Sequence, residues 1–446
     1  MKKYQTIFQL GVFLLLCPFP TAHSADTLNE MLEHIHTERM MNDIESLSHV
    51  QFEGRQAGTV GGQQAANFVR NRFERLRLIP NGHVENRGTK RTWVQQQSLS
   101  APRLHGSTVV EFTPSHNGQI QTPSKSTFGT DFLPILDSPS VNMTAPIVFV
   151  GYGIDDPARG INDYEGIDVH NRIVMFFRGK PTTYSQWVTH EEKTRTAHQH
   201  GAVGFITLTG PILNRYEARR GIGRIPLAMY SSTPDERPLP GVWLDGAFGE
   251  QLFASQEHSL KEIQAQLNEG KNLSKKLHAV STLQWTNTPT TGKLINVVGM
   301  ISGKNSMLSH EIILIGAHRD HFGKQAGLLF AGADDNASGT AVLLEMARLF
   351  STIKEGPART IVLVSFDGEE RGLLGSKLYV QQPRHPLHKT VAMINVDHVG
   401  VGNGKLTVGL TRFPKSIGQQ AAARTSLKET EKTPPHQGVQ PPTDPM

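Results

Sequence analysis

Four short segments of the chain concentrate histidine and carboxylate side chains, the residue types that act in metal-assisted hydrolysis. They are Gly316-Ala317-His318-Arg319-Asp320-His321, Gly332-Ala333-Asp334-Asp335-Asn336-Ala337-Ser338-Gly339, Phe366-Asp367-Gly368-Glu369-Glu370 and Asn395-Val396-Asp397-His398. If these carboxylates converge, their mutual repulsion forces several of them to take up protons unless cations are present. Imidazole and carboxylate ligands without a thiolate suit Zn²⁺, with Mn²⁺ and Co²⁺ as alternatives.

The elements around these segments are expected to bring them to one place. Apolar runs of strand length end just before His318, before Glu369 and Glu370, and before Asp397. Asp335 directly precedes an apolar-periodic stretch that predicts a helix over 338–351. In an open α/β sheet, ligands bind at the edge where the strands end. The sequence therefore predicts one metal site at that edge.

Each segment also has a simpler interpretation when it is taken alone. Asp334 and Asp335 could cap a helix N-terminus, where carboxylates are favoured. Glu369 and Glu370 could begin a solvated helix, His318 could be a buried core histidine, and Asp397 could lie in a turn. Four such interpretations at one edge, in strand order, are less economical than a single site.

From residue 294 onward the pattern is typical of an α/β fold. Apolar runs over 294–301, 311–316, 360–366 and 390–395 predict strands, and helices are predicted over 338–351 and 372–381. Near-continuous apolar strands indicate a mixed, largely parallel sheet with helices on both faces. Nearer the N-terminus, apolar residues at helical spacing predict a helix over 65–76. Residues 81–125 are polar and strand-poor, and the sequence assigns no element there.

Residues 126–275 show a different sequence pattern, in which short runs of β-branched residues alternate with turns rich in Gly, Pro and Asp. Strands are predicted over 147–150, 173–177 and 204–208, and a helix over 190–200. Gly151-Tyr152-Gly153-Ile154, the segment 162–169 and the pair Gly201-Ala202 resemble a protease-associated (PA) domain. The segment has no nucleophile or metal cluster, so we expect a β-rich insert that acts as a lid or a docking surface for substrate.

The composition bounds the class of protein and its compartment. The chain has 446 residues, enough for two to three domains, and its net charge of +5 is spread along the sequence, so no nucleic-acid partner is implied. Lys2 and Lys3 precede an apolar stretch over 7–19 and a small-residue cleavage pattern over 21–25. This pattern predicts a signal peptide at 1–24, and its apolar stretch is too short for a membrane span of ~20 residues, so no stable membrane anchor is expected. The only cysteine, Cys17, lies within it, which favours a periplasmic or secreted protein without disulfides.

Taken together, the motifs resemble peptidase family M28, the co-catalytic zinc aminopeptidases, in the subgroup that carries a PA insert. The resemblance rests on Ala-His-Arg-Asp-His, Gly-Ala-Asp-Asp-Asn-Ala-Ser-Gly, Phe-Asp-Gly-Glu-Glu-Arg-Gly and Ile-Asn-Val-Asp. It implies two Zn²⁺ ions per chain, bridged by Asp335. His318 and Asp397 would complete the first site, and Glu370 would hold the second.

The resemblance also implies the catalytic roles. Glu369 would be the general base that takes a proton from a metal-bridging water, and Asp320 would accept a hydrogen bond from the His318 ring and fix its tautomer. Peptides would be the substrates, cleaved from the amino terminus. Glutaminyl cyclases and carboxypeptidases on the same fold are the alternatives within this class.

The C-terminal part departs from the pattern that the resemblance implies. A complete family member has a further histidine ligand downstream, whereas only 49 residues follow Asp397 and the last 13, residues 434–446, contain five prolines. His436, the only histidine after His398, lies in an unlike context. We therefore expect a peptidase domain made of residues 25–125 and 276–433, a truncated or frame-shifted end with an irregular Pro-rich tail, and an incomplete second zinc site. The alternative function is a catalytically impaired homologue that acts, if at all, as a peptide-binding protein. The sequence does not predict the oligomeric state.

Overall fold

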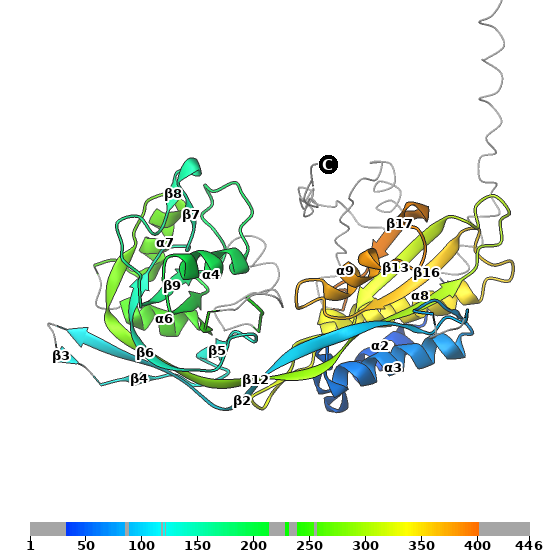
Figure 1. The fold of residues 1–446 in the computed structure, drawn as a ribbon, viewed down its shortest axis with the longest axis horizontal. Helices are drawn as coiled ribbons and strands as arrows, with labels where there is room; N and C mark the ends of the chain where they lie inside the picture. Colours follow the sequence, from blue (N-terminus) through cyan, green and yellow to red (C-terminus); the bar gives the residue numbers. More distant parts are fainter. Residues whose placement is uncertain are drawn as a thin grey trace, which may run out of the picture.

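The computed structural model describes residues 33–84, 89–116, 119–120, 122–213, 228–231, 239–253 and 257–400. The predicted signal peptide, the Pro-rich tail and His436 lie outside these ranges. Figure 1 shows two lobes joined by two long strands, β2 (Val94–His116) and β12 (Lys275–Ile301). Within the described residues, no helix has both the length and the apolar character needed to cross a bilayer.

One sheet runs through both lobes, in the strand order β17-β13-β16-β12-β6-β9-β10-β11-β5. Its strands in the first lobe, besides the end of β12, are β13 (Ile312–His318), β16 (Thr360–Phe366) and β17 (Thr390–Asn395). Those in the second lobe are β5 (Phe132–Pro134), β6 (Val141–Phe149), β9 (Ile173–Phe177), β10 (Gly204–Leu208) and β11 (Gly241–Leu244). β17, β13 and β16 form one parallel group, and β6, β9, β10 and β11 form another. β12 lies between the two groups and is antiparallel to its neighbour in each.

Helices cover both faces of the sheet in the first lobe. Helix α3 (Val60–Arg75) and helix α8 (Gly339–Ser351) pack on one face, in a core that includes Val297 and Leu363. Helix α9 (Leu374–Gln381) packs on the other face, where its Tyr379 joins residues of β12, β13 and β16. The expected mixed, largely parallel sheet with helices on both faces is confirmed.

Strand burial explains why the apolar runs predicted these strands well. Every residue of β16 is buried, and so are all but one of β13. A strand covered on both faces needs apolar side chains at successive positions, which is the pattern that the sequence shows. β17 lies at the end of the sheet, and its Val391, Met393 and Ile394 are exposed.

The second lobe contains the segment predicted to be an insert. Among the described residues of this lobe, the helices are α4 (His190–Gln199), α6 (Gly246–Phe253) and α7 (Leu260–Asn268). Helix α4 starts with a capping box, because Thr189 and Glu192 each bond to the other's backbone N–H. Two apolar cores, one on each face of the sheet, stabilise this lobe.

The remaining described elements are short, apart from one helix. They are α2 (Thr37–Ser48), η1 (Val50–Arg55), β1 (Ile79–Pro80), β3 (Gln119–Ile120), β4 (Ser124–Lys125), β7 (Asp155–Asp156), η2 (Pro157–Arg159), β8 (Ile161–Asn162), β14 (Gly323–Gln325), β15 (Leu328–Phe330), η3 (Ala333–Ser338) and η4 (Leu387–Lys389).

Residues 81–125, which the sequence analysis described as strand-poor and left unassigned, contain the long strand β2. β2 and β12 pair antiparallel from Val94↔Val297 to Ala279↔Pro114, with one irregularity between Gln284 and Thr286. Because the pair leaves one lobe and enters the other as a ribbon, much of its surface can remain polar. Its stability comes from pairing with a segment far along the chain, which a local sequence pattern does not reveal.

A second connection between the lobes lies near the candidate site. Tyr230, from the second lobe, accepts a hydrogen bond from Gln56 Nε2 at 3.0 Å. The guanidinium of Arg371 lies 5.4 Å from the centre of the tyrosine ring, and the ring of Phe322 lies 6.0 Å away. The second lobe therefore touches the segment that follows β13.

Candidate metal centre

Three parallel strands deliver the predicted residues to one edge of the sheet. His318 is the last residue of β13, Glu369 and Glu370 follow β16, and Asp397 follows β17. Because β17, β13 and β16 are adjacent and parallel, their carboxyl ends meet at the same edge. Asp335 reaches this edge from η3, the turn that leads into α8.

The structure brings together one group of three possible ligands around His318. His318 Nε2 lies 3.4 Å from Asp335 Oδ1 and 3.3 Å from Asp397 Oδ1. One ligand atom from each of the three residues lies within 4.8 Å of the other two, close enough for a single ion to bind them all. These are the three residues that the resemblance assigned to the first site.

A second group shares Asp335 with the first and contains a residue that the sequence analysis gave no role. His321 Nδ1 lies 2.6 Å from Glu370 Oε1 and 4.0 Å from Asp335 Oδ2. The expectation that only Asp335 and Glu370 remain for a second ion is therefore incomplete. The sequence did contain a signal for His321 as a possible ligand, because this residue lies three positions after His318 in the same segment.

A third histidine, His398, was also given no role by the sequence analysis. Its Nε2 lies 3.2 Å from Asp335 Oδ2, and its Nδ1 lies 3.2 Å from Asp334 Oδ2. Asp334 also accepts a hydrogen bond from the Gly400 N–H at 2.8 Å. These contacts hold the segment after β17 against the segment that carries Asp335.

Asp320 organises the backbone under the two glutamates. Its carboxylate accepts hydrogen bonds from the N–H groups of Glu369 and Glu370, at 3.1 and 3.3 Å. The same carboxylate lies 3.7 Å from His318 Nδ1, whereas the Asp320 carbonyl oxygen lies 3.3 Å from that nitrogen. Asp320 therefore meets both the histidine and the glutamate segment, and its backbone oxygen is the nearer partner of the ring.

The simpler interpretation of Asp334 and Asp335 as helix caps is not supported. Ser338 is the N-cap residue of α8 and makes no side-chain capping bond. The Asn336 side chain instead accepts a hydrogen bond from the Gly339 N–H at 2.9 Å. This arrangement leaves the Asp335 carboxylate to face the histidines.

The electrostatics match the crowding of acids predicted from the sequence. Burial raises the pKa of Glu369 to about 8, and burial together with Asp335 and Asp320 raises the pKa of Glu370 well above its ordinary value. Burial alone would raise the pKa of Asp335 too, but hydrogen bonds from His318 and His398 lower it. A divalent ion would relieve this repulsion and leave the carboxylates ionised.

Two histidines of the site have opposite electrostatic environments. Burial lowers the pKa of His321 to about 4. Burial also acts to lower the pKa of His398, but its hydrogen bond with Asp335 and the charge of Asp397 together raise it to about 9. His321 is therefore neutral at neutral pH, the form in which an imidazole binds metal.

A cavity of about 210 Å³ opens beside the first group. It is lined by His318, Phe366, Asp367, Glu369, Leu373, Ser376, Met393, Asn395 and Asp397. Glu369 thus faces the cavity without being part of either ligand group. Its position suits a residue that exchanges a proton with a bound molecule.

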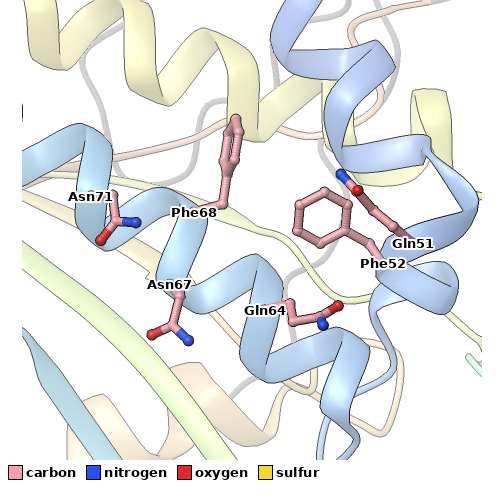
Figure 2. Close-up of a pocket in the computed structure, with 6 residues that line it drawn as sticks. All are labelled: Gln51, Phe52, Gln64, Asn67, Phe68 and Asn71. Carbon is pink, nitrogen blue, oxygen red and sulfur yellow. The ribbon is translucent and has the colours of Figure 1, made fainter.

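A larger concavity, about 310 Å³, lies elsewhere on the first lobe, between η1 and α3. Figure 2 shows the rings of Phe52 and Phe68 beside the amides of Gln51, Gln64, Asn67 and Asn71. Its lining has no titratable side chain, so it offers no group for acid–base or metal chemistry.

Comparisons with known proteins place the part of the chain that holds the two ligand groups among proteases in sequence similarity. Residues 296–443, which include every residue of both ligand groups, match the model of Peptidase family M28. The match covers 148 of the 446 residues, the part of the chain that carries the candidate site.

Two curated relatives and two solved structures illustrate the likeness. The chain is 25% identical over 380 residues to "Probable glutamate carboxypeptidase LAMP1" of Arabidopsis thaliana, a match that covers 78% of this chain and 53% of that protein. It is 32% identical over 171 residues to "Leucine aminopeptidase 1" of Metarhizium robertsii, covering 37% of this chain and 42% of that protein. The chain thus spans about half the length of the curated relatives it matches.

The solved structures show the same fold at low sequence identity. An aminopeptidase from Aneurinibacillus sp. strain AM-1 superposes with a TM-score of 0.55 at 22% identity, covering 83% of this chain and 72% of that one. BSAP, a zinc aminopeptidase from Bacillus subtilis, gives a TM-score of 0.55 at 21% identity, covering 88% of this chain and 79% of that one.

Proposed function

We propose that the chain is a zinc-dependent aminopeptidase that removes N-terminal residues from peptides. The observation that carries the proposal is the pair of ligand groups that share Asp335 at the end of three parallel strands, with Glu369 facing the adjacent cavity. Oxygen and imidazole donors without thiolate fit zinc, and the raised pKa values of the glutamates fit a site built for positive charge. The names of the relatives, which include aminopeptidases, support the direction of cleavage.

The assignment of ligands follows the two groups. His318, Asp335 and Asp397 would hold one ion, and Asp335 with Glu370 would bind a second. When bound, zinc supplies the positive charge that polarises a scissile carbonyl and lowers the pKa of water.

Glu369 would move the proton in this reaction. Its carboxylate would accept a proton from the attacking water and donate it to the nitrogen of the leaving amine, so that the glutamate is an ionised carboxylate again at the end of each cycle. Asp320 fixes the backbone N–H groups of Glu369 and Glu370, which holds the proton carrier beside the ligand. The adjoining Leu373, Ser376 and Met393 would face the substrate from the wall of the cavity.

We also propose that the protein acts outside the cytoplasm, in the periplasm or after secretion. The support is the charged and apolar pattern of residues 1–24 and the absence of cysteine from the rest of the sequence. The second lobe, with its PA-like motifs, is proposed as the surface that admits or orients peptides.

The test is hydrolysis by the full chain before and after chelation. Aminoacyl amides with a free amino group should be cleaved, chelator should abolish cleavage, and added Zn²⁺ should restore it. N-acetylated substrates should resist cleavage. Asp335→Ala should release metal, whereas Asp168→Ala, a change at an exposed carboxylate of the second lobe, should not.

Two results would reject this function. Hydrolysis of N-acetylated dipeptides that carry a free C-terminal carboxylate, with sparing of the free-amine amides, would instead indicate a carboxypeptidase. Binding of peptides without metal and without turnover would indicate a binding protein.

A further inference from the structure

His321 belongs to the second ligand group by geometry alone. Its Nδ1 faces the carboxylates of Glu370 and Asp335, at 2.6 and 4.0 Å, and its side chain is 12% exposed. The ligand atoms of the three residues lie within 4.8 Å of one another. Two carboxylates and one inward imidazole are the donor set of a three-ligand zinc site.

The backbone around His321 holds the ring in this position. Gly332, in the segment that leads to Asp335, has a positive φ of 58°, and a Cβ at this residue would lie 2.6 Å from the imidazole carbons of His321. The segment therefore packs its backbone directly on the ring. Arg55 bonds both sides of the contact, because it donates to the carbonyls of Arg319 and Gly332, each at 2.7 Å.

The second lobe supports the same segment from outside. The ring of Phe322 lies 4.5 Å from the ring of His321 and packs edge-on against Phe330, with ring centres 6.1 Å apart. The ring of Tyr230, from the second lobe, lies 6.0 Å from the ring of Phe322. A side chain fixed on several sides loses little freedom when it binds an ion, as expected for a preorganised ligand.

His398 is the competing imidazole, and its contacts differ. Its two ring nitrogens face Asp334 and Asp335, each at 3.2 Å, and it belongs to neither ligand group. Its ring thus bridges the carboxylate of Asp335 to a carboxylate outside both groups. This geometry is typical of a residue that does not bind the ion itself but hydrogen-bonds to a metal ligand, here Asp335, and fixes its orientation.

We propose that His321, through Nδ1, is the third protein ligand of the second ion, together with Asp335 and Glu370. This inference rests on the proposed function, since it assumes that the site binds metal. It makes each of the two ions a three-ligand site with a shared carboxylate.

The experiment measures metal stoichiometry and affinity, with Co²⁺ and Zn²⁺ as probes, by titration of the chelated full chain and elemental analysis. The wild-type protein should bind two ions. His321→Ala should bind one ion with unchanged affinity and the second ion at least ~100-fold more weakly. This loss exceeds the ~10–100-fold loss of metal affinity that is typical when a residue that only hydrogen-bonds to a ligand is removed. His398→Ala, the matched control, should keep both ions within that smaller range. His321→Asp, which restores an oxygen ligand, should recover part of the second affinity.

The outcomes separate this inference from the proposed function. If the wild-type protein and His321→Ala both bind two ions with equal affinity, His321 is not a ligand, and the proposed function is unaffected. The same conclusion follows if only His398→Ala loses the second ion. No ion in wild type would reject the function itself. If His321→Ala fails to fold, anomalous scattering from zinc-loaded wild-type crystals decides: an ion ~2.0–2.1 Å from His321 Nδ1 supports the role, and an ion beyond bonding distance overturns it.

Discussion

Glu369 and Glu370 are neighbours in sequence but face different surroundings. Glu370 lies against His321 in the second ligand group, whereas Glu369 lines the cavity beside His318. We therefore expect Glu369→Gln to keep its metal and lose most of its turnover, by about 10²-fold or more, because the amide cannot carry the proton. Elemental analysis and kcat measured on aminoacyl amides check both parts. Normal turnover in Glu369→Gln would remove this residue from the role of base.

Arg55 is a buried cation whose hydrogen bonds all reach backbone carbonyls. It donates to Leu47, Arg319, Ala331 and Gly332, each at 2.7 Å, and has no exposed surface. Burial lowers its pKa to about 10, so it remains charged at neutral pH. It thereby joins the C-terminal turn of α2 to both segments that carry the ligands.

Removal of Arg55 should destabilise the fold. Arg55→Met should lower the free energy of unfolding by about 3 kcal/mol or more, because four carbonyls lose a charged donor in a buried place. Arg55→Lys should recover only a minor part, since an ammonium group cannot span the same carbonyls. Denaturant unfolding checks this, with Arg75→Met on the exposed surface of α3 as the control. Equal midpoints for Arg55→Met and Arg75→Met would contradict it.

At the level of residues, the sequence predicted four of the five members of the two ligand groups. His318, Asp335, Glu370 and Asp397 were found because each lies beside the end of a strand or the start of a helix. His321 was missed because its position depends on the packing of Gly332 and Phe322, not on the spacing of the motif. Arg55 was missed for a similar reason, since its partners lie far along the chain.

At the level of elements, the buried strands were predictable and the ribbon was not. The ranges 173–177, 204–208, 360–366 and 390–395 match strands of the structure, since apolar runs bounded by turns are a local signal. β2 carries no such signal, because its partner β12 supplies the hydrogen bonds and solvent covers much of its surface.

The ribbon also approaches the turn before α3 very closely. A Cβ on Gly292 of β12 would lie 1.8 Å from the carbonyl oxygen of Gly58, so the two backbones touch. Gly292→Ala should therefore lower the free energy of unfolding by ~1–3 kcal/mol, because either the strand or the turn must shift.

The check on Gly292→Ala is a shift in the denaturant midpoint. Thr291→Ala, at the exposed neighbouring position, is the matched control and should change the midpoint little. A midpoint for Gly292→Ala equal to that of the control would mean that the turn moves freely.

At the scale of the whole molecule, the acid-rich edge makes stability depend on pH when no metal is bound. Glu369, with its pKa raised to about 8, keeps a proton that the unfolded chain releases above about 4.5, so its contribution falls as the pH rises. His398, with its pKa raised to about 9, contributes most below 6.5 and loses that contribution towards pH 9. His321 acts in the opposite sense, but only between about pH 4 and 6.5.

We therefore expect the metal-free protein to lose stability between pH 6.5 and 9. Each tenfold change in proton affinity is worth ~1.4 kcal/mol, so the total loss is a few kcal/mol. Denaturant unfolding of the chelated chain at several pH values measures it. Zinc should reverse the trend, because fewer protons compete for the ligands as the pH rises. An unchanged slope in the Glu369→Gln, His398→Ala double variant would show that other groups cause it.

Because β2 pairs with β12, the chain leaves the first lobe and returns to it at neighbouring positions. Arg103 lies opposite Thr288, so the whole span between them could be excised and replaced by an Asn-Gly reverse turn without altering the strand register on the near side. The distal lobe is in this sense a separable module. The metal content of such a shortened chain would show whether the candidate metal site persists without the contacts that Tyr230 makes.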